Sequence, residues 1–571
     1  MTRPSVPPAG GGKTGPAAGP PPHPSALAGA VVGVLTAAVA MGVGQLAAGL
    51  TVAQSSPVLA VGQAAIDLTP LPVKDFAIST FGTDDKTALL VGILVILAAF
   101  AAVIGILAVR RLALGLAGLA VFACIGLAAA LTRPTATAAY VIPTLVGAAA
   151  GAFALTRLVR AARRLDSPPS RSAGARTSAS ELKPPDLPGP AEATPAPASS
   201  FTFLPNPDDR GPSRGPARRR FLTTSGVAVV TAAASALVGR ELITRHNVSA
   251  ARSALRFPKP AVAAPPLPPG VNLNIPGLSS FITPNGSFYR VDTALLLPEV
   301  DPATWQLRIH GMVQREVTIT FDQLLRRPLA ENYITLTCVS DPVGGPYVGN
   351  ARWLGASLAD LIGQARPLAG ADQLLCTSVD GFTSGTPLQI VLDGRDALLT
   401  VAMNGQALPV EHGFPARMVV PGLYGYVSAC KWVTEIEVTT FASAYAYWAT
   451  RGWSQQGPIK TESRIDVPVS NATIAPGRTP VAGVAWAQHK GVAAVEVRVD
   501  NGPWQQARLA AVPDIDTWRQ WVWEWDATPG THVLEARATD ATGYTQTAAQ
   551  AQPPPNGASG YPSATVVVRK S

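Results

Sequence analysis

The sequence has few charged residues and few cysteines, and it lacks the short cysteine motifs that identify several common redox and metal centres. Charged residues make up 14% of the 571, and there are four cysteines and six histidines. No CxxCH or CxxC motif occurs. These absences exclude covalent haem attachment and the zinc or iron–sulfur sites built on CxxC pairs. So little charge in so long a chain instead indicates several domains, part of them in a membrane.

The net charge of +9 is the one feature that favours a nucleic-acid partner. The excess comes largely from arginines that flank apolar segments or fall in one linker. Basic residues placed this way set the orientation of membrane spans. We therefore predict no nucleic-acid partner.

Four long apolar segments lie in the first third of the chain, each long enough to cross a hydrocarbon core of about 30 Å. They cover roughly residues 26–53, 87–109, 112–132 and 136–156. Arginines stand between the second and third segments and follow the fourth, whereas acidic residues dominate the loop at 54–86. The positive-inside rule then places the amino terminus, the loop at 110 and the chain after 157 in the cytoplasm. Residues 1–164 are predicted to be a four-helix transmembrane region.

The predicted spans contain no histidine, and their only cysteine is Cys124. A bundle that binds haem b needs intramembrane imidazoles. The bundle is therefore predicted to carry no haem, and any electron acceptor must be a separate molecule. The lack of intramembrane charge also argues against a transporter.

The segment at 218–244 follows a Pro-, Ser- and Ala-rich stretch, 165–217, that has the composition of a cytoplasmic linker. It begins with paired arginines, followed by Phe221, Leu222 and a weakly apolar run. This resembles a twin-arginine export signal, although it stands inside the chain. The alternative is an ordinary fifth span. Both interpretations place residues 245–571 on the extracytoplasmic face, which gives a multi-pass cell-membrane protein.

The predicted extracytoplasmic part divides into three regions. Residues 245–278 are predicted to be a Pro-rich extended linker. Residues 279–463 mix short strands with helix-like stretches such as "ASLADLIGQAR", so an α+β domain is expected. Residues 464–571 alternate apolar and polar positions between turn signals, including "VEVRVDNGPWQQARL". That pattern predicts an immunoglobulin-like antiparallel β-sandwich.

Cys338 ends an apolar strand and is followed by the glycine-rich turn "VSDPVGG". A thiol in this place is either a core residue or a ligand. A thiolate is the protein ligand expected for a soft or high-valent metal, and glycines leave room for a large cofactor. Cys376 and Cys430 are expected to pack or to pair.

Residues 279–570 resemble the sulfite oxidase family of molybdenum–molybdopterin oxidoreductases. The resemblance rests on "LTCVSDPVGG", "VGNARWLGASLADLI", "NGQALPVEHGFPARMVVPGLYGYVSACKW", "YWATRGW" and "SRIDVP", which occur in the family's order and spacing. It implies that Cys338 ligates molybdenum and that His412, Arg417 and Lys431 bind the pterin and its phosphate. It also implies that Arg290 lies near a substrate anion. Further cofactor-binding positions are expected at Asn285, Phe288, Tyr289 and Ser428.

The chain departs from sulfite oxidases in three places. The ligand cysteine is followed by "VSDPVGG" in place of an arginine-containing turn. The tyrosine that the family places beside the metal falls on Trp453, and Val291 and Asp292 replace an asparagine–histidine pair. The resemblance therefore supports the cofactor more strongly than it supports sulfite as substrate.

The resemblance implies an enzyme that transfers an oxygen atom to or from a small anionic or oxide substrate, with sulfite the first candidate. Molybdenum would alternate between oxidation states VI and IV. The electrons would pass to a separate cytochrome, redox protein or quinone, and residues 464–571 would form a homodimer. Two alternatives remain: a reductase of S-oxides or N-oxides on the same cofactor, and a cofactor-free binding or assembly protein.

Overall fold

The computed structural model describes residues 25–51, 55–70, 73, 85–133, 136–165, 215–244 and 248–569. The linker predicted at 165–217 lies almost wholly outside these residues. The chain divides into two compact units. One holds the long apolar helices and the other is formed mainly by residues 244–571, and each is described by itself.

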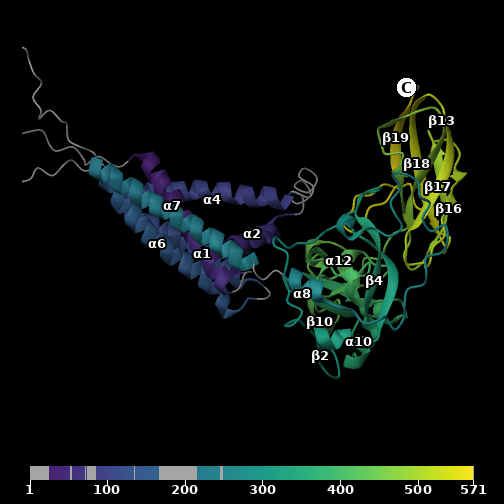
Figure 1. The fold of residues 1–571 in the computed structure, drawn as a ribbon, viewed down its shortest axis with the longest axis horizontal. Helices are drawn as coiled ribbons and strands as arrows, with labels where there is room; N and C mark the ends of the chain where they lie inside the picture. Colours follow the sequence, from purple (N-terminus) through teal and green to yellow (C-terminus); the bar gives the residue numbers. More distant parts are fainter. Residues whose placement is uncertain are drawn as a thin grey trace, which may run out of the picture. The chain divides into compact units, whose positions relative to one another are not determined.

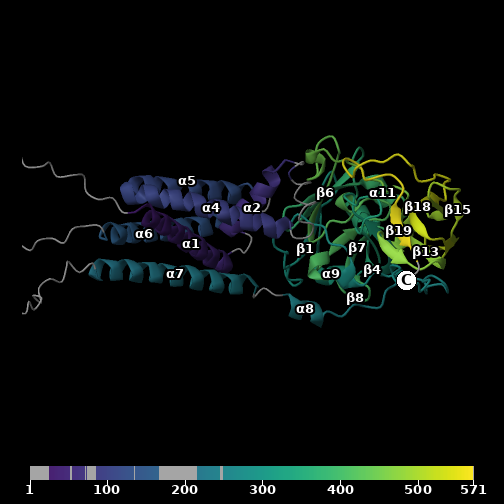
Figure 2. The ribbon, with the colours of Figure 1, turned by 90° about the horizontal axis from the view of Figure 1, so that it is seen from above.

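The first unit is a bundle of long helices that run side by side in both views (Figures 1 and 2). Five helices in the described part are long and apolar enough to cross a membrane, one in each predicted segment. A shorter helix, α2 (Pro57–Leu68), lies where a loop was expected between the first two spans. The long helices are α1 (Ala26–Leu50), α4 (Asp85–Arg110), α5 (Leu112–Leu131), α6 (Ile142–Arg163, preceded by η3, Ala138–Val141) and α7 (Gly215–Thr244).

Helix α1 packs closely on its neighbours because glycines face them. A Cβ at Gly33 would overlap the Ala101 backbone in α4, and one at Gly42 would overlap the Ala232 backbone in α7. Small residues bring helix backbones together in membranes, where packing drives association. Large apolar side chains such as Val95 and Phe100 point outward and are more than half exposed. A helix that is apolar on its outer face is suited to a lipid environment.

The second unit begins with α8 (Ser249–Ala254) and the Pro-rich lead. The sequence predicted an extended linker here, but the lead packs against the domain that follows. Arg252 donates to the carbonyl oxygens of Ala407 and Leu408, and Val262 forms a parallel bridge with Ala330.

Two sheets and several short helices form the domain that carries Cys338 (Figure 1). One sheet has the order β2-β1-β10-β5-β6 and the other β3-β4-β7-β8, with β9 paired to β7. Buried apolar side chains from both sheets and from α9 and α10 make a continuous core. The strands are β1 (Gln306–Gly311), β2 (Val317–Thr320), β3 (Leu329–Thr337), β4 (Val348–Ser357), β5 (Gln373–Ser378), β6 (Thr383–Pro387), β7 (Leu398–Met403), β8 (Gln406–Ala407), β9 (Arg417–Val419) and β10 (Val433–Thr439). The helices are η4 (Asn285–Ser287), α9 (Phe321–Leu325), α10 (Leu358–Ala365), α11 (Leu388–Leu392), η5 (Val410–His412), α12 (Gly425–Ser428) and η6 (Ala449–Arg451).

The last part of the chain forms two antiparallel-rich sheets that share one apolar core, drawn in yellow-green and yellow (Figure 1). Trp521 and Trp525 of β17 point into this core, whereas Glu524 between them is exposed. This alternation agrees with the apolar and polar pattern from which strands were predicted over residues 464–571. The strands are β11 (Glu462–Val467), β12 (Ala472–Ile474), β13 (Gly477–Trp486), β14 (Val492–Val499), β15 (Gln505–Gln506), β16 (Arg508–Leu509), β17 (Arg519–Ala527), β18 (Gly530–Asp540) and β19 (Ser563–Val568).

Candidate functional site

Cys338 lies at the first position after β3, where the β3–β4 hairpin opens into its loop. Its backbone N–H donates to Tyr347 O at 2.9 Å, which continues the pairing of the two strands. The Cys338 side chain is a free thiol, 8% exposed, and its Sγ lies 2.9 Å from Ser340 Oγ. Burial raises the pKa of this thiol, and the contact with Ser340 opposes the rise. The thiolate is the form that ligates a metal, so Cys338 would have to lose its proton when a metal binds.

The loop after Cys338 is closed by Asp341, whose Oδ1 accepts the Tyr347 N–H at 2.9 Å. Gly345 packs against this carboxylate so closely that a Cβ would overlap it. Burial raises the pKa of Asp341 to about 7. Sequence reasoning did not select Asp341 as a site residue. The sequence feature that could have identified Asp341 is its position three residues after Cys338, the candidate metal ligand.

Three cations gather on the other side of the site. Arg417, at the start of β9, donates to His412 O at 3.1 Å and Ala429 O at 3.2 Å. Lys431 Nζ lies 3.0 Å from Asp292 Oδ2, and Arg290 Nε donates to the same carboxylate oxygen at 2.8 Å. Lys431 and Arg290 share this carboxylate and Arg417 bonds to carbonyl oxygens instead, so the four side chains carry two more positive charges than negative ones.

His412 supports this cluster as a neutral imidazole. It is 3% exposed, and its Nε2 lies 3.3 Å from Asn285 O. Its pKa is lowered to about 3, first because burial disfavours the imidazolium and then because Arg417 and Lys431 are nearby cations. At neutral pH the ring therefore supplies one donor and one acceptor but no charge.

The segment 285–289 joins the cations to Cys338. The Phe288 ring contacts His412 edge-to-face at 5.5 Å and stacks on Tyr289 at 5.3 Å. Burial is the main cause that raises the pKa of Tyr289; nearby Cys338 raises it further, and Arg417 lowers it. The phenol therefore lies within electrostatic reach of both groups. The Asn285 side chain is fixed by an Asn404 N–H that donates to its Oδ1 at 2.8 Å.

Ten site residues were predicted from the sequence. The structure brings seven of them together around the cationic cluster. They are Asn285, Phe288, Tyr289, Arg290, His412, Arg417 and Lys431.

The other three predicted site residues, Cys338, Trp453 and Ser428, are not part of this group. Cys338 is linked to the cluster electrostatically, since Lys431 lowers its pKa. Trp453 shares a buried apolar cluster with Val339, the residue after Cys338, and its indole nitrogen has no partner among the described residues. The Ser428 hydroxyl donates to the carbonyl oxygens of Leu423 and Tyr424, so it caps its own turn and points to no other site residue.

Comparison with known proteins identifies the same region. Residues 294–448 match the model of the oxidoreductase molybdopterin binding domain. Mouse mitochondrial sulfite oxidase is 29% identical over 286 residues, which cover 43% of this chain and 52% of that protein. The uncharacterized oxidoreductase YuiH of Bacillus subtilis is 30% identical over 157 residues, covering 28% of this chain and 76% of that protein.

Among solved structures, the sulfane dehydrogenase SoxCD from Paracoccus pantotrophus matches with 24% identity and a TM-score of 0.42. The match covers 46% of this chain and 74% of that one. The chain spans about half the length of the mammalian sulfite oxidases that it matches. The matched domain and the sequence relatives, sulfite oxidase and YuiH, show that the chain belongs to the sulfite oxidase family of molybdopterin-dependent oxidoreductases.

Proposed function

We propose that this protein is a membrane-anchored molybdenum–molybdopterin oxidoreductase that transfers an oxygen atom to or from a small substrate on the extracytoplasmic side. The observation that supports this most directly is one buried thiol, Cys338, that lies near the buried cation Lys431 and, through Tyr289, near Arg417. In this proposal, the thiol holds the metal and the cluster holds the charged end of the cofactor.

The charges of the cluster fit a phosphate. Arg417 and Lys431 are buried, and burial lowers their pKa values to about 10 and about 8. Both groups are therefore largely charged at neutral pH. Buried cations need counterions. Asp292 pairs with Lys431 and with Arg290, whose side chain is 42% exposed, whereas Arg417 bonds to carbonyl oxygens. A phosphate dianion would balance the remaining two positive charges, with Arg417 presenting a planar donor edge.

The neutral groups fit the pterin. His412 Nε2–H donates to Asn285 O, which leaves Nδ1 as an acceptor for the pterin, and the Phe288–Tyr289 stack offers a flat apolar surface beside it. Molybdenum in this cofactor supplies the two-electron redox change that accompanies oxygen-atom transfer. The residues of this chain bind the cofactor, orient it and exclude water around it.

Sulfite is the first substrate to test, because the mammalian relatives are sulfite oxidases. The turn after Cys338 contains Asp341 and no arginine, so this chain differs from the sulfite-binding pattern. Assays should therefore include S-oxides and N-oxides in the reducing direction. Electrons would be exchanged with a separate cytochrome, redox protein or quinone, and we propose that residues 464–571 adopt an immunoglobulin-like fold and form a homodimer.

The test is the molybdenum content of the full-length protein, purified from a host that makes molybdopterin. We expect about one molybdenum per chain in the wild type and a loss of most of it in Cys338→Ser. Cys376→Ser is the matched control, because Cys376 is also buried and lies in the core. A wild-type protein without molybdenum would instead support the cofactor-free binding protein.

The orientation is tested with thiol labelling of intact cells. Val469 is 65% exposed in the C-terminal sheets, and Arg111 follows α4 at the predicted cytoplasmic side. A membrane-impermeant thiol reagent should label Val469→Cys in intact cells and Arg111→Cys only after lysis. The wild-type protein gives the background labelling. Labelling in the opposite order would reverse the proposed orientation.

A further inference from the structure

The β3 strand that leads to Cys338 is at the edge of its sheet, so one side of its backbone needs partners outside the sheet. Near its start the Pro-rich lead supplies them, because Glu331 N–H donates to Val262 O. Near its end, next to Cys338, they come from the C-terminal sheets. Thr335 N–H donates to Asp516 O at 2.9 Å.

Gln488 makes the contact closest to the ligand position. This side chain is 3% exposed and lies just after β13. Its Nε2 donates to Thr335 O and to Thr337 Oγ1, both at 3.1 Å. Thr337 directly precedes Cys338, and both threonines are fully buried. The side-chain amide of Gln488 therefore binds two groups near the end of β3, the Thr335 carbonyl and the Thr337 hydroxyl.

A second set of contacts extends from the same strand to the segment predicted to wrap the pterin. Trp518 N–H donates to Thr335 Oγ1 at 2.7 Å, and this hydroxyl donates to Asn350 Oδ1 at 3.0 Å. Asn350 also bonds with Thr283 through its backbone N–H, which donates to the threonine hydroxyl at 3.1 Å. Thr283 lies two residues before Asn285. The C-terminal sheets are therefore connected both to the Cys338 strand and to the 283–289 segment.

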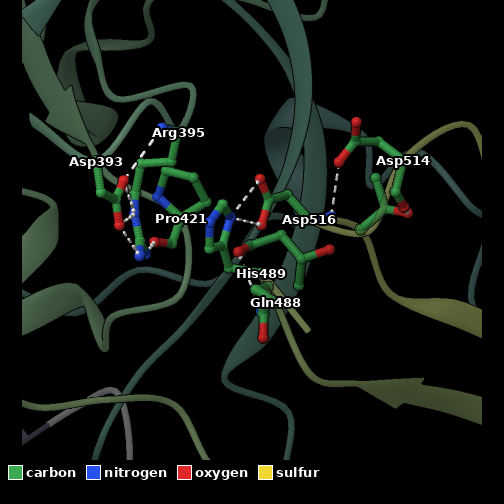
Figure 3. A network of polar contacts seen from close by, with 9 residues as sticks. Asp393, Arg395, Pro421, Gln488, His489, Asp514 and Asp516 are labelled. Carbon is green, nitrogen blue, oxygen red and sulfur yellow. Dashed lines mark hydrogen bonds and ion pairs between the residues drawn. The ribbon is translucent and has the colours of Figure 1, made fainter. Parts of the chain in front are cut away.

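The loop that carries Gln488 also lies close to the domain of Cys338 at Gly422. Figure 3 shows His489 between Asp516 and the Arg395–Pro421 pair, and the Gln488 side chain points away from the His489 ring. His489 Nδ1 lies 3.4 Å from Asp516 Oδ1, and Arg395 donates to Pro421 O at 2.6 Å. The backbone at Gly422 passes so close to His489 and Arg395 that a Cβ would lie 2.7 Å from the guanidinium. The same Cβ would lie 3.2 Å from His489 Cβ and 3.5 Å from Gln488 O, so the backbone of this loop packs directly against Gly422.

We infer that Gln488 is a positioning residue for the metal ligand, acting through Thr335 and Thr337 to fix the backbone from which Cys338 extends. The C-terminal sheets would then be a structural part of the metal site as well as a candidate dimer interface. Groups that orient a metal ligand without touching the metal strongly affect metal retention. The inference rests on the proposed molybdenum site at Cys338.

The test compares Gln488→Met with a control glutamine in full-length holoprotein. Methionine keeps the size of the side chain, removes both hydrogen bonds and also removes Oε1, which has no partner among the described residues. Gln546→Met is the control. Gln546 is also 3% exposed, but its side chain bonds to Ser463, Ala538 and Gly560 inside the C-terminal sheets.

Two readouts are needed: the rate at which molybdenum is lost during dialysis, and the electron paramagnetic resonance spectrum of Mo(V). For Gln488→Met we expect about tenfold faster loss of molybdenum and a shifted spectrum. Gln546→Met should keep the wild-type values even where its unfolding temperature falls further. Thr337→Val, which removes the acceptor hydroxyl, should change both readouts in the same direction and replaces Gln488→Met if that variant fails to fold.

The outcomes separate the two proposals. If wild-type protein holds molybdenum and both Gln488→Met and Thr337→Val match it in retention and spectrum, the positioning role is overturned while the proposed function stands. Equal changes in Gln546→Met would also overturn it, because they would show a general effect of stability. If wild-type protein holds no molybdenum, the proposed function fails and the inference fails with it.

Discussion

Lys431 and Asp292 form a buried ion pair in which Nζ lies 3.0 Å from Oδ2 and the side chains are 11% and 3% exposed. The same carboxylate accepts from Arg290, so one negative charge serves two cations, and Arg417 is a further cation near Lys431. Asp292 appeared in the sequence only as a departure from the family pattern. In the structure, Asp292 is the counterion of Lys431 and Arg290.

Asp292→Asn should destabilise the cofactor-free protein by about 3 kcal/mol, because removal of one partner leaves buried cations without a counterion. The measurement is thermal unfolding of the purified full-length protein at neutral pH. Asp526→Asn, on an exposed position of β17, should leave the unfolding temperature nearly unchanged. An equal effect of both substitutions would contradict the assignment of Asp292 as the counterion.

Arg417→Lys should reduce molybdopterin retention about tenfold although the charge is kept. The guanidinium bonds to three carbonyl oxygens and lies 5.2 Å from the centre of the Trp353 ring, and an ammonium group cannot make all of these contacts. Retention is measured from the fluorescence of the released pterin. Arg478→Lys is the control, since Arg478 is 74% exposed and distant in sequence from the site. Full retention in Arg417→Lys would show that charge alone is sufficient.

Glu462→Gln should make stability less dependent on pH. Glu462 is 7% exposed, and burial, with a further contribution from nearby Asp341, raises its pKa from 4.5 to about 8. A raised pKa in the folded state means that stability is full below about pH 4.5 and falls as the pH rises to about 8.

The variant should therefore be more stable than wild type at pH 9, by on the order of 5 kcal/mol, and similar at pH 4. Unfolding temperatures across this range give the comparison. Glu524→Gln, on an exposed position of β17, should follow the wild-type pH profile. Parallel pH profiles for wild type and Glu462→Gln would show that this carboxyl is not protonated in the folded protein.

Gly33→Ala and Gly92→Ala should have opposite effects on the helix bundle. A Cβ at Gly33 overlaps the backbone of Ala101, whereas one at Gly92 has no neighbour within 4 Å. Alanine favours helix by about 1 kcal/mol over glycine, so Gly92→Ala should stabilise slightly and Gly33→Ala should destabilise. Unfolding in detergent micelles distinguishes them, and two stabilised variants would contradict the close contact of α1 and α4.

Local features of the sequence predicted local features of the structure. The apolar runs became long helices because their length and composition are themselves the signal. The hairpin at 492–506 also formed where an Asn-Gly turn was expected, with Val497 paired to Gln505. Its left-handed residues are Asp500 and Asn501, so the turn is placed one residue earlier than the Asn-Gly signal suggests.

The sequence by itself determined the order of the spans, the strand that ends at Cys338 and the motif blocks that indicate the family. Tertiary structure alone decided which polar groups meet. Gln488 reaches Thr335 across 153 residues and Lys431 reaches Asp292 across 139. No periodicity or motif encodes these pairs, because the two residues of each pair come together only when distant parts of the chain pack against each other. The residues that hold a site in place are selected by burial and contact, which short-range sequence patterns do not report.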